Sequence, residues 1–336
     1  RLDIEDPGQL PNYLLETGRI EAGENTEFTR LTGGVSCSTV LVRRQNGPSF
    51  VIKQALSRLR VATRWVSSPE RSHREAMGIE WLNRLTPDKS IPALLFEDRE
   101  NHVLAMAAVP SPHDNWKSLL LAGTLLEDHA RQFGSLLGAI HANAYRQSEE
   151  IEPVFRDYSF IETLRLEPYY EFTRSQVEEA AGFLDDLLAE TRANRMTLVH
   201  GDYSPKNVLV HQGRLILLDH ETIHWGDPMF DLGFSLTHFL SKANHDPGRK
   251  SGFARLALVH WQTYRERVGD SFWDQDCEAR AVRHTLGCLL ARIKGRSPLE
   301  YLDSGQQDRQ RECVIGLMRK APDSVPVLIR SFIAKL

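Results

Sequence analysis

Residues 198–209, with the sequence LVHGDYSPKNVL, join two short apolar runs through a polar loop. The loop carries Asp202 and, five positions later, Asn207. Asp219 follows twelve residues after Asn207, directly behind the apolar run LILL at 215–218. Short apolar runs bounded by turn-forming residues predict buried strands. The pattern therefore predicts a hairpin that brings the oxygen atoms of these three side chains together.

Such a group of oxygens suits phosphoryl transfer. That reaction needs a carboxylate that orients and deprotonates the attacking hydroxyl, and it needs oxygen ligands for Mg²⁺. Asp202 can provide the first, and Asn207 and Asp219 can provide the second. Asp202, Ser204 and Asn207 are also turn formers, so a purely structural turn explains this segment equally well when it is taken alone.

Upstream residues favour the chemical interpretation by their order along the chain. Gly33, Gly34 and Ser36 lie in a turn between predicted strands, where backbone N–H groups can approach phosphate oxygens. Lys53 ends the next predicted strand, and Glu75 on the following predicted helix can pair with it. Each feature is common alone, as a plain turn, a solvated lysine or a surface glutamate. Their joint order ahead of the Asp/Asn loop is improbable by chance.

The first third of the chain is rich in predicted strands. Asn46-Gly47 is a hairpin signal between two β-branched runs, and Ser68-Pro69 predicts the start of a helix that runs to about Leu85. The prolines at 110 and 112 mark a boundary, which gives a nucleotide-binding lobe at 1–109 and a catalytic and substrate-binding lobe at 110–336. The predicted strands lie at residues 38–43, 50–53, 94–96 and 103–106.

The remainder is predicted to be mainly helical. Thr124 with Glu127 and Ser175 with Glu178 have capping-box spacing, and each pair predicts a helix start. Around 197–218 the hydrophobic period changes to that of short strands, and helical periodicity then resumes from Asp227-Pro228 to the end of the chain.

Composition excludes several classes of protein. The 336 residues are 41% hydrophobic and 26% charged, which is typical of a globular protein and long enough for two lobes. The formal net charge of −4 argues against a nucleic-acid partner, and no apolar run is long enough to cross a membrane. The four scattered cysteines favour a reducing, cytoplasmic location. The oligomeric state is left open between a monomer and a homodimer.

These motifs together resemble the aminoglycoside phosphotransferase superfamily, the kinase-like fold shared with choline, methylthioribose and fructosamine kinases. His200-Gly201-Asp202 with Asn207 is similar to the catalytic loop of that family. Asp219-His220-Glu221, followed by Gly226-Asp227-Pro228 and Asp231-Leu232, is similar to its metal segment. The resemblance implies an α+β, two-lobed, protein-kinase-like fold with a small antiparallel-sheet lobe and a larger, mainly helical lobe.

The resemblance also implies roles for individual residues. It implies that Asp202 is the catalytic base and that Asn207 and Asp219 hold Mg²⁺. It places the nucleotide between the lobes, with the hinge at 106–109; because Ala107-Ala108 replace the acidic residue often seen there, ATP is implied and GTP stays open. The implied nucleotide-binding residues are Gly33, Gly34, Ser36, Lys53, Glu75, Met106 and Ala108.

Departures from protein kinases point to a small-molecule substrate. Only nine positions separate Asp219 from Pro228, which leaves no room for a phosphorylatable activation loop. A kinase of small hydroxylated molecules, either metabolites or antibiotic-like natural products, is therefore expected. A nucleotide-binding pseudokinase is the alternative, although every catalytic position is filled, and a protein kinase is less favoured.

The acceptor is expected beside Asp202, walled by the insertion at 157–194 and the C-terminal helices. For the aromatic candidates, core packing is the simpler explanation. The charges of residues 1–109 cancel, so the net charge of −4 belongs to residues 110–336. This small excess favours an acceptor less cationic than an aminoglycoside. The candidate acceptor residues are Arg165, Tyr169, Tyr170, Glu221, Trp225 and Arg292.

Overall fold

A five-stranded antiparallel sheet forms the core of the small lobe in the computed structural model, which describes residues 2–32, 34, 36–60 and 65–336. The strand order is β1-β2-β3-β5-β4. The β2–β3 hairpin turns at the predicted Asn46-Gly47. The strands are β1 (Thr26–Arg30), β2 (Cys37–Arg44), β3 (Phe50–Ala55), β4 (Leu94–Asp98) and β5 (Val103–Ala107).

The two faces of this sheet have different neighbours because side chains alternate along a strand. Phe50 and Ile52 of β3 pack into a small apolar core with Leu10 and Leu14 of α1 (Gln9–Glu16). Lys53, one position later, faces α2 (Arg71–Leu85) on the other side. The period of two thus directs Lys53 towards α2 and away from the small apolar core.

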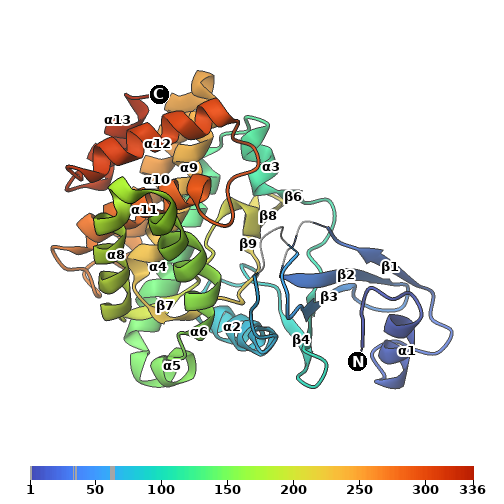
Figure 1. The fold of residues 1–336 in the computed structure, drawn as a ribbon. Coiled ribbons are helices and arrows are strands. Elements are labelled where there is room, and N and C mark those ends of the chain that lie inside the picture. The colour runs from blue at the N-terminus through green and yellow to red at the C-terminus, as the bar shows by residue number, and fades with distance from the viewer. Residues whose placement is uncertain (1, 33, 35, 61–64) are drawn as a thin grey trace.

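The large lobe is built mainly of helices, and it lies to one side of the sheet (Figure 1). The N-terminus is at the outer end of the small lobe, whereas the C-terminus lies on the far side of the large lobe. The helices are α3 (Trp116–Leu121), α4 (Glu127–Arg146), α5 (Ser148–Phe155), α6 (Ser159–Ile161), η1 (Glu162–Glu171), α7 (Phe172–Gln176), η2 (Glu178–Ala180), α8 (Ala181–Ala193), α9 (Pro228–His245), η4 (Pro247–Arg249), α10 (Lys250–Val268), α11 (Cys277–Lys294), α12 (Ser304–Met318) and α13 (Val325–Ile333).

Two small antiparallel sheets cross the large lobe where it meets the small one. One has the order β6-β8-β9 and the other pairs β10 with β7. The predicted hairpin is the β8–β9 pair, and the segment 108–113, which contains the predicted lobe division, leads from β5 to β6. The strands are β6 (Asp114–Asn115), β7 (Thr197–Val199), β8 (Val208–His211), β9 (Arg214–Leu217) and β10 (His224–Gly226), with the short helix η3 (Pro205–Asn207) ahead of β8.

Helix α9 is the most deeply buried element of the large lobe. Every residue from Pro228 to Asn244 is buried, and α10 and α11 pack against it. Next to it, α4 approaches α10 closely at Gly134, where a Cβ atom would lie 2.4 Å from the His260 carbonyl oxygen. The close approach therefore requires glycine at this position, and it fixes the helical frame that supports β7 and the loop after it.

Several local predictions are confirmed and others are wrong. The four predicted strands of the small lobe are present, with α1 as an additional element. Both capping-box predictions are wrong. Helix α4 begins at Glu127 behind Leu126 with no side-chain cap, and Ser175 lies inside α7, so that α8 begins only at Ala181. Tertiary packing, rather than a cap, sets these helix starts.

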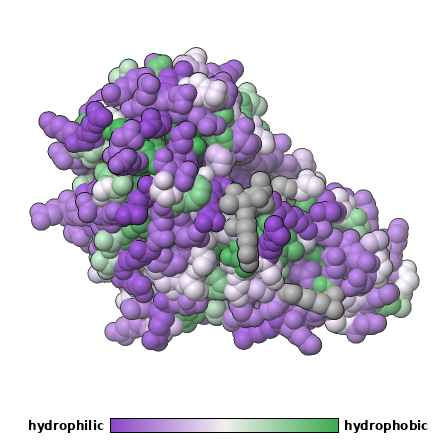
Figure 2. Space-filling model, viewed as in Figure 1, coloured by the Kyte–Doolittle hydropathy of each residue, from purple (hydrophilic) through white to green (hydrophobic). Residues whose placement is uncertain are grey.

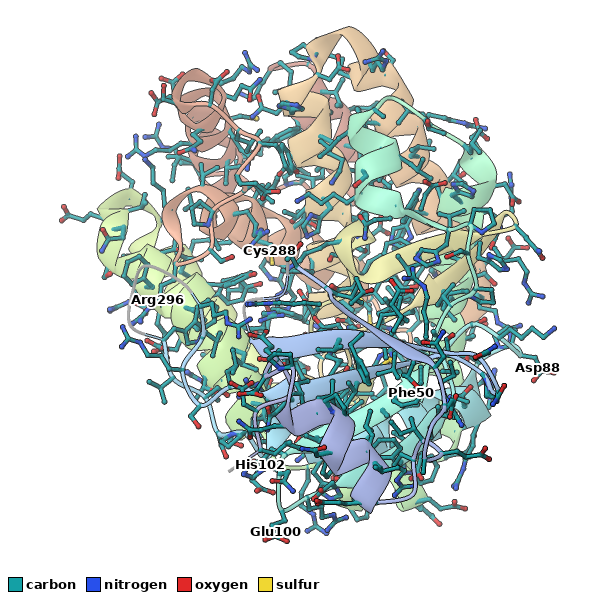
Figure 3. The ribbon with its side chains drawn as sticks, turned by 90° about the vertical axis from the view of Figure 1, so that its right-hand side faces the viewer. Phe50, Asp88, Glu100, His102, Cys288 and Arg296 are labelled. Atoms are coloured by element: carbon teal, nitrogen blue, oxygen red, sulfur yellow. The ribbon has the colours of Figure 1, made fainter. Side chains whose placement is uncertain are left out.

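The outer surface is mainly hydrophilic. Hydrophobic residues on the visible face occur in small groups (Figure 2). Viewed from the small lobe, Phe50 lies on the sheet, Glu100 and His102 lie at the turn between β4 and β5, and Cys288 lies behind the sheet on α11 (Figure 3). Over the described ranges, no helix combines the length and apolar character that a membrane span needs.

Candidate active site

The loop between β7 and β8 is held in place by a buried carboxylate. Asp231, on the first turn of α9, accepts hydrogen bonds from the backbone N–H groups of His200 at 2.7 Å and Gly201 at 2.8 Å. Gly201 has a φ of +79°, and a Cβ atom there would lie 2.8 Å from the Thr222 hydroxyl oxygen. Glycine at this position therefore lets the loop pass close to the metal segment.

Two donors fix the carboxylate of Asp202, the predicted base. Arg165 of η1 contacts one oxygen at 2.9 Å, and the side-chain amide of Asn207 donates to the other at 2.7 Å. Arg165 also donates to the Gly201 carbonyl at 2.8 Å. Burial disfavours the guanidinium, but Asp202 more than offsets this effect and raises the pKa of Arg165. Arg165, predicted as an acceptor residue, thus contacts the loop that carries Asp202.

Lys53 joins the two lobes. Its ammonium lies 2.7 Å from a Glu75 carboxylate oxygen and 2.8 Å from Asp219, as the predicted Lys–Glu pair requires. Burial alone would raise the pKa of Asp219, but the Lys53 ammonium holds it well below its ordinary range. Burial raises the pKa of Glu75, because this carboxylate is the more deeply enclosed partner of a shared cation.

A second buried ion pair links the metal segment to the start of α2. Arg71 is fully buried and donates to Glu221 at 2.9 Å. The same guanidinium donates to the carbonyl oxygens of Ser36 and Leu56. Glu221, predicted as an acceptor residue, is therefore engaged in a contact that fixes the glycine turn relative to the segment after Asp219.

The predicted nucleotide-binding residues lie along the inner edge of the small lobe. Gly34 is exposed and Ser36 is buried, whereas Gly33 lies outside the described residues. Met106 belongs to the larger apolar core and is 4% exposed. The Ala108 N–H donates to the Ser49 carbonyl at 3.1 Å. These contacts position the connecting segment, and they leave its binding role a prediction.

The remaining acceptor candidates are mostly packed in the interior. Trp225 lies on β10 in the apolar core and is 3% exposed. Tyr170 is fully buried, with its hydroxyl 2.9 Å from His284. Tyr169 is different, because its hydroxyl accepts a hydrogen bond from Arg292 at 3.0 Å and its ring also contacts Arg165. This ring therefore connects Arg292 to the residue that holds Asp202.

Sequence reasoning missed two residues that support this geometry. Asp231 was predicted only as part of a family motif, yet its carboxylate holds the loop that carries Asp202. No role was predicted for Arg71. A basic residue in the first turn of a helix is disfavoured by the helix dipole, so its presence indicates a specific partner. A carboxylate among the apolar residues that begin α9 is a comparable signal for Asp231.

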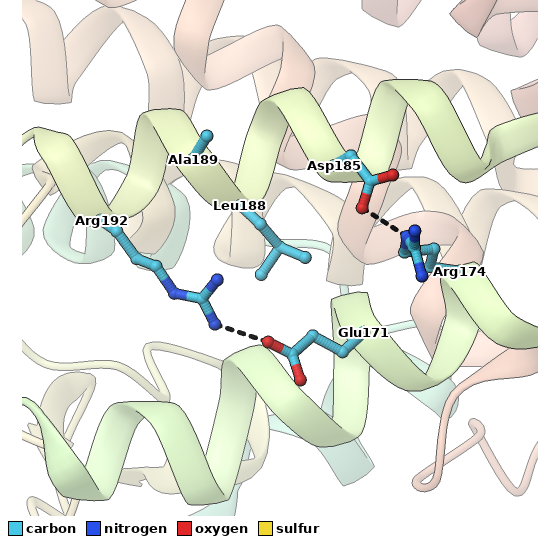
Figure 4. Close-up of a pocket in the computed structure, with 6 residues that line it drawn as sticks. All are labelled: Glu171, Arg174, Asp185, Leu188, Ala189 and Arg192. Carbon is cyan, nitrogen blue, oxygen red and sulfur yellow. Dashed lines mark hydrogen bonds and ion pairs between the residues drawn. The ribbon is translucent and has the colours of Figure 1, made fainter.

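A shallow depression between η1, α7 and α8 does not take part in this site. Its charged side chains pair with one another, since Arg192 contacts Glu171 at 2.5 Å and Arg174 contacts Asp185 (Figure 4). None of the predicted site residues lines it. The chemically competent groups are instead those between the lobes.

Comparison with known sequences places this geometry in context. The model of the phosphotransferase enzyme family matches residues 27–267. A methylthioribose kinase of Pectobacterium atrosepticum is 25% identical over 312 residues, which cover 78% of this chain and 77% of that protein. A methylthioribose kinase of Klebsiella pneumoniae is 24% identical over 258 residues, covering 67% and 64% of the two chains.

Solved structures support the fold class. Amicoumacin kinase in complex with AMP-PNP and Ca²⁺ has a TM-score of 0.57 at 14% identity, covering 89% of this chain and 90% of that chain. An ADP-bound aminoglycoside phosphotransferase has a TM-score of 0.51 at 14% identity, covering 93% and 99%. The predicted two-lobed kinase-like fold is confirmed.

Proposed function

This chain belongs to the phosphotransferase enzyme family and is a small-molecule kinase, and on that premise we propose that it transfers the γ-phosphoryl group of ATP to a hydroxyl, with Mg²⁺ and with Asp202 as base. One observation carries the proposal. The Lys53 ammonium contacts both Glu75 and Asp219. In the loop ahead of Asp219, Asn207 donates a hydrogen bond to Asp202. This arrangement joins a phosphate-binding cation, metal-binding oxygens and a base in one place.

The residues present fit Mg²⁺. One Asp219 oxygen contacts Lys53, which leaves the other free, and the side chain is 28% exposed. Asn207 donates its amide N–H to Asp202, so its amide oxygen is available. Among the described residues no three His, Cys, Asp or Glu side chains are grouped as a metal cage. Mg²⁺ commonly binds through one or two protein groups and substrate phosphates, and there it neutralises phosphate charge.

Lys53 is suited to hold the nucleotide. Burial opposes its charged form, but Asp219 and Glu75 raise its pKa, so it stays an ammonium at neutral pH. Relatives of the same fold are bound to AMP-PNP or ADP, which supports an adenine nucleotide, and GTP remains an outcome of the assay. Gly34 and Ser36 are the described residues of the turn that would cover the phosphates.

Asp202 acts on the acceptor. Its carboxylate accepts the hydroxyl proton as the acceptor oxygen bonds to the γ-phosphorus and the bond from that phosphorus to the β,γ-bridging oxygen breaks. The products are the phosphate ester and ADP. Arg165 and Asn207 hold the carboxylate in one orientation, so most of the contribution is positioning.

The acceptor class and the cellular location are proposed from separate observations. Several curated relatives are methylthioribose kinases, which supports a hydroxylated small molecule as acceptor. The four cysteines are free and buried, in keeping with the proposed reducing, cytoplasmic location. The proposal includes neither a nucleic-acid nor a membrane partner, in keeping with the net charge of −4.

An ADP-release screen over hydroxylated metabolites and natural products tests the function. With an accepted compound, Asp202→Asn should lower kcat by about 10²–10⁴-fold, because the base no longer takes the proton. Asp186→Asn, an exposed aspartate on α8, is the matched control and should retain full activity.

The nucleotide-dependent thermal shift separates the remaining alternatives. Both variants should show the same rise in Tm with ATP and Mg²⁺ as the parent protein. A thermal shift without transfer to any compound would favour a pseudokinase. Full turnover by Asp202→Asn would exclude Asp202 as the base.

A further inference from the structure

A second lysine is buried in the large lobe without a carboxylate. Lys242 of α9 is 1% exposed, and its ammonium donates to the His238 carbonyl at 3.3 Å and lies over the Tyr301 ring at 5.3 Å. Within the described parts of the chain, no acidic side chain forms an ion pair with it. Burial, together with repulsion from Lys117 and Arg292, lowers the pKa of Lys242 to about 7, and Glu300 offsets only part of this effect.

The groups around Lys242 are also basic and incompletely bonded. We call Lys117, His238, Lys242, Arg292 and Tyr301 the basic cluster. His238 is 5% exposed, and its Nε2 has no hydrogen-bond partner. Arg292 Nε and the Tyr301 hydroxyl are likewise buried without a partner. Native interiors rarely leave several polar groups unsatisfied in one place, so the cluster needs a polar occupant.

One carboxylate reaches the edge of the basic cluster. Glu300 pairs with Lys117, but its side chain is 66% exposed. An exposed pair contributes little to stability, so another anion can replace it at small cost. Glu300 lies on the segment between α11 and α12, which also carries Tyr301 and covers the cluster.

The basic cluster is connected to the catalytic loop through one aromatic ring. The Arg292 and Arg165 guanidinium carbons lie 5.7 Å and 5.6 Å from the centre of the Tyr169 ring. Arg165 contacts Asp202. On the other side, Lys206 of the catalytic loop is close enough to His238 to help lower its pKa, after burial and the cations of the cluster.

We propose that the acceptor is an anionic hydroxylated molecule, whose carboxylate or phosphate binds Lys242, Arg292 and His238 while its hydroxyl faces Asp202. An anion supplies acceptor atoms for the donors that lack partners and compensates the buried positive charge. This inference rests on the proposed kinase function and adds the substrate class. It also gives a physical reason why a lobe with net negative charge concentrates cations beside its catalytic loop.

Matched pairs of compounds test the inference by ADP release. Each anion is compared with a neutral analogue: gluconate with gluconamide, glycerate with glyceramide, and glucose 6-phosphate with glucose. We expect kcat/KM to be at least about tenfold higher for the anionic members. The carboxylate and phosphate pairs then show which anion fits. Equal turnover of the neutral members would overturn the inference and leave the kinase function standing.

Variants show whether the basic cluster causes the preference for anionic acceptors. Lys242→Met should remove the preference for anions, and Arg292→Gln should do the same if Lys242→Met fails to fold. Lys250→Met is the matched control, since Lys250 donates to the Ile333 carbonyl at 3.3 Å on another helix. A preference that persists in both cluster variants would overturn the inference.

A binding measurement decides the case in which no compound of the panel is turned over. Thermal shifts with malonate and with malonamide are recorded with ADP and Mg²⁺ present, so that the nucleotide site is occupied. Malonate alone should raise the Tm of the parent and Lys250→Met proteins but not that of Lys242→Met. No rise, or an equal rise in Lys242→Met, would overturn the inference. Loss of the nucleotide shift itself would instead count against the kinase function.

Discussion

Lys53 and Lys242 are both enclosed by protein, yet their surroundings have opposite electrostatic character. Lys53 lies between two carboxylates, and its pKa is raised. Lys242 has a carbonyl and an aromatic ring as neighbours, and its pKa is lowered to about 7. The first lysine is compensated by the protein itself. The second forms no ion pair with a described acidic side chain and is compensated only in part, by Glu300. This is the state expected of a site whose counter-charge arrives with a ligand.

The two lysines belong to networks that differ in how completely their charges are paired. The Lys53 network connects β3, α2 and the segment that begins at Asp219, so the charges proposed to hold the nucleotide are already fixed by one another. The basic cluster connects α3, α9 and α11 around donors that have no partner. A preorganised network at the proposed reaction centre thus coexists with a group of unsatisfied donors at the proposed acceptor site.

The same substitution at the two lysines should change stability in opposite directions. Lys53→Met leaves Glu75 and Asp219 as buried carboxylates without a cation, and we expect the free energy of unfolding to fall by about 3–5 kcal/mol. Urea denaturation at pH 7 measures this change. Unchanged stability would show that the two carboxylates are compensated by other groups and would break the comparison.

Lys242→Met should have the opposite sign. It replaces an uncompensated buried ammonium with an apolar side chain of similar length, and we expect the free energy of unfolding to rise by about 1–4 kcal/mol at pH 7 without ligand. The same denaturation series includes Lys250→Met as a control, for which little change is expected. A loss of stability in Lys242→Met would mean that Lys242 has a compensating partner.

The stability difference between Lys242→Met and the parent protein should depend on pH. The folded-state pKa of Lys242, about 7, is below its unfolded value, so the unfolded chain binds more protons between about pH 7 and pH 10. The free energy of unfolding of the parent protein should therefore rise with pH in this window relative to that of the variant. The slope should be about 1.4 kcal/mol per pH unit at most. Parallel curves over the window would contradict the lowered pKa.

Arg165 lies between the two regions, and its substitution should have the smallest effect. Arg165→Gln removes one of the donors that hold Asp202, and we expect kcat to fall roughly tenfold while KM for ATP stays the same. Steady-state kinetics with ATP varied at a saturating acceptor concentration separate the two constants. A raised KM for ATP with an unchanged kcat would show that Arg165 serves nucleotide binding instead.

Much of the catalytic centre could be predicted from the sequence because its residues are close along the chain or stand at the ends of strong elements. The spacing of Asp202, Asn207 and Asp219 indicated one hairpin, and the alternation of β3 placed Lys53 opposite Ile52. Helix starts were predicted less well. The capping-box patterns at Thr124 and Ser175 failed, because packing against neighbouring helices outweighs a local cap of about 1 kcal/mol.

By itself, the sequence determined the two-lobed kinase-like fold through its resemblance to a family, and it predicted the oxygen ligands and the base from residues that are close along the chain. Only the tertiary structure decided that Arg165 holds Asp202, that Arg71 engages Glu221 and that Lys242 lies buried beside Arg292. These contacts join residues 37 to 150 positions apart, or helices whose relative placement no local pattern encodes. The electrostatic character of the proposed acceptor site is therefore a property of helix packing, because the net charge of the chain does not reveal the cations that the fold brings together.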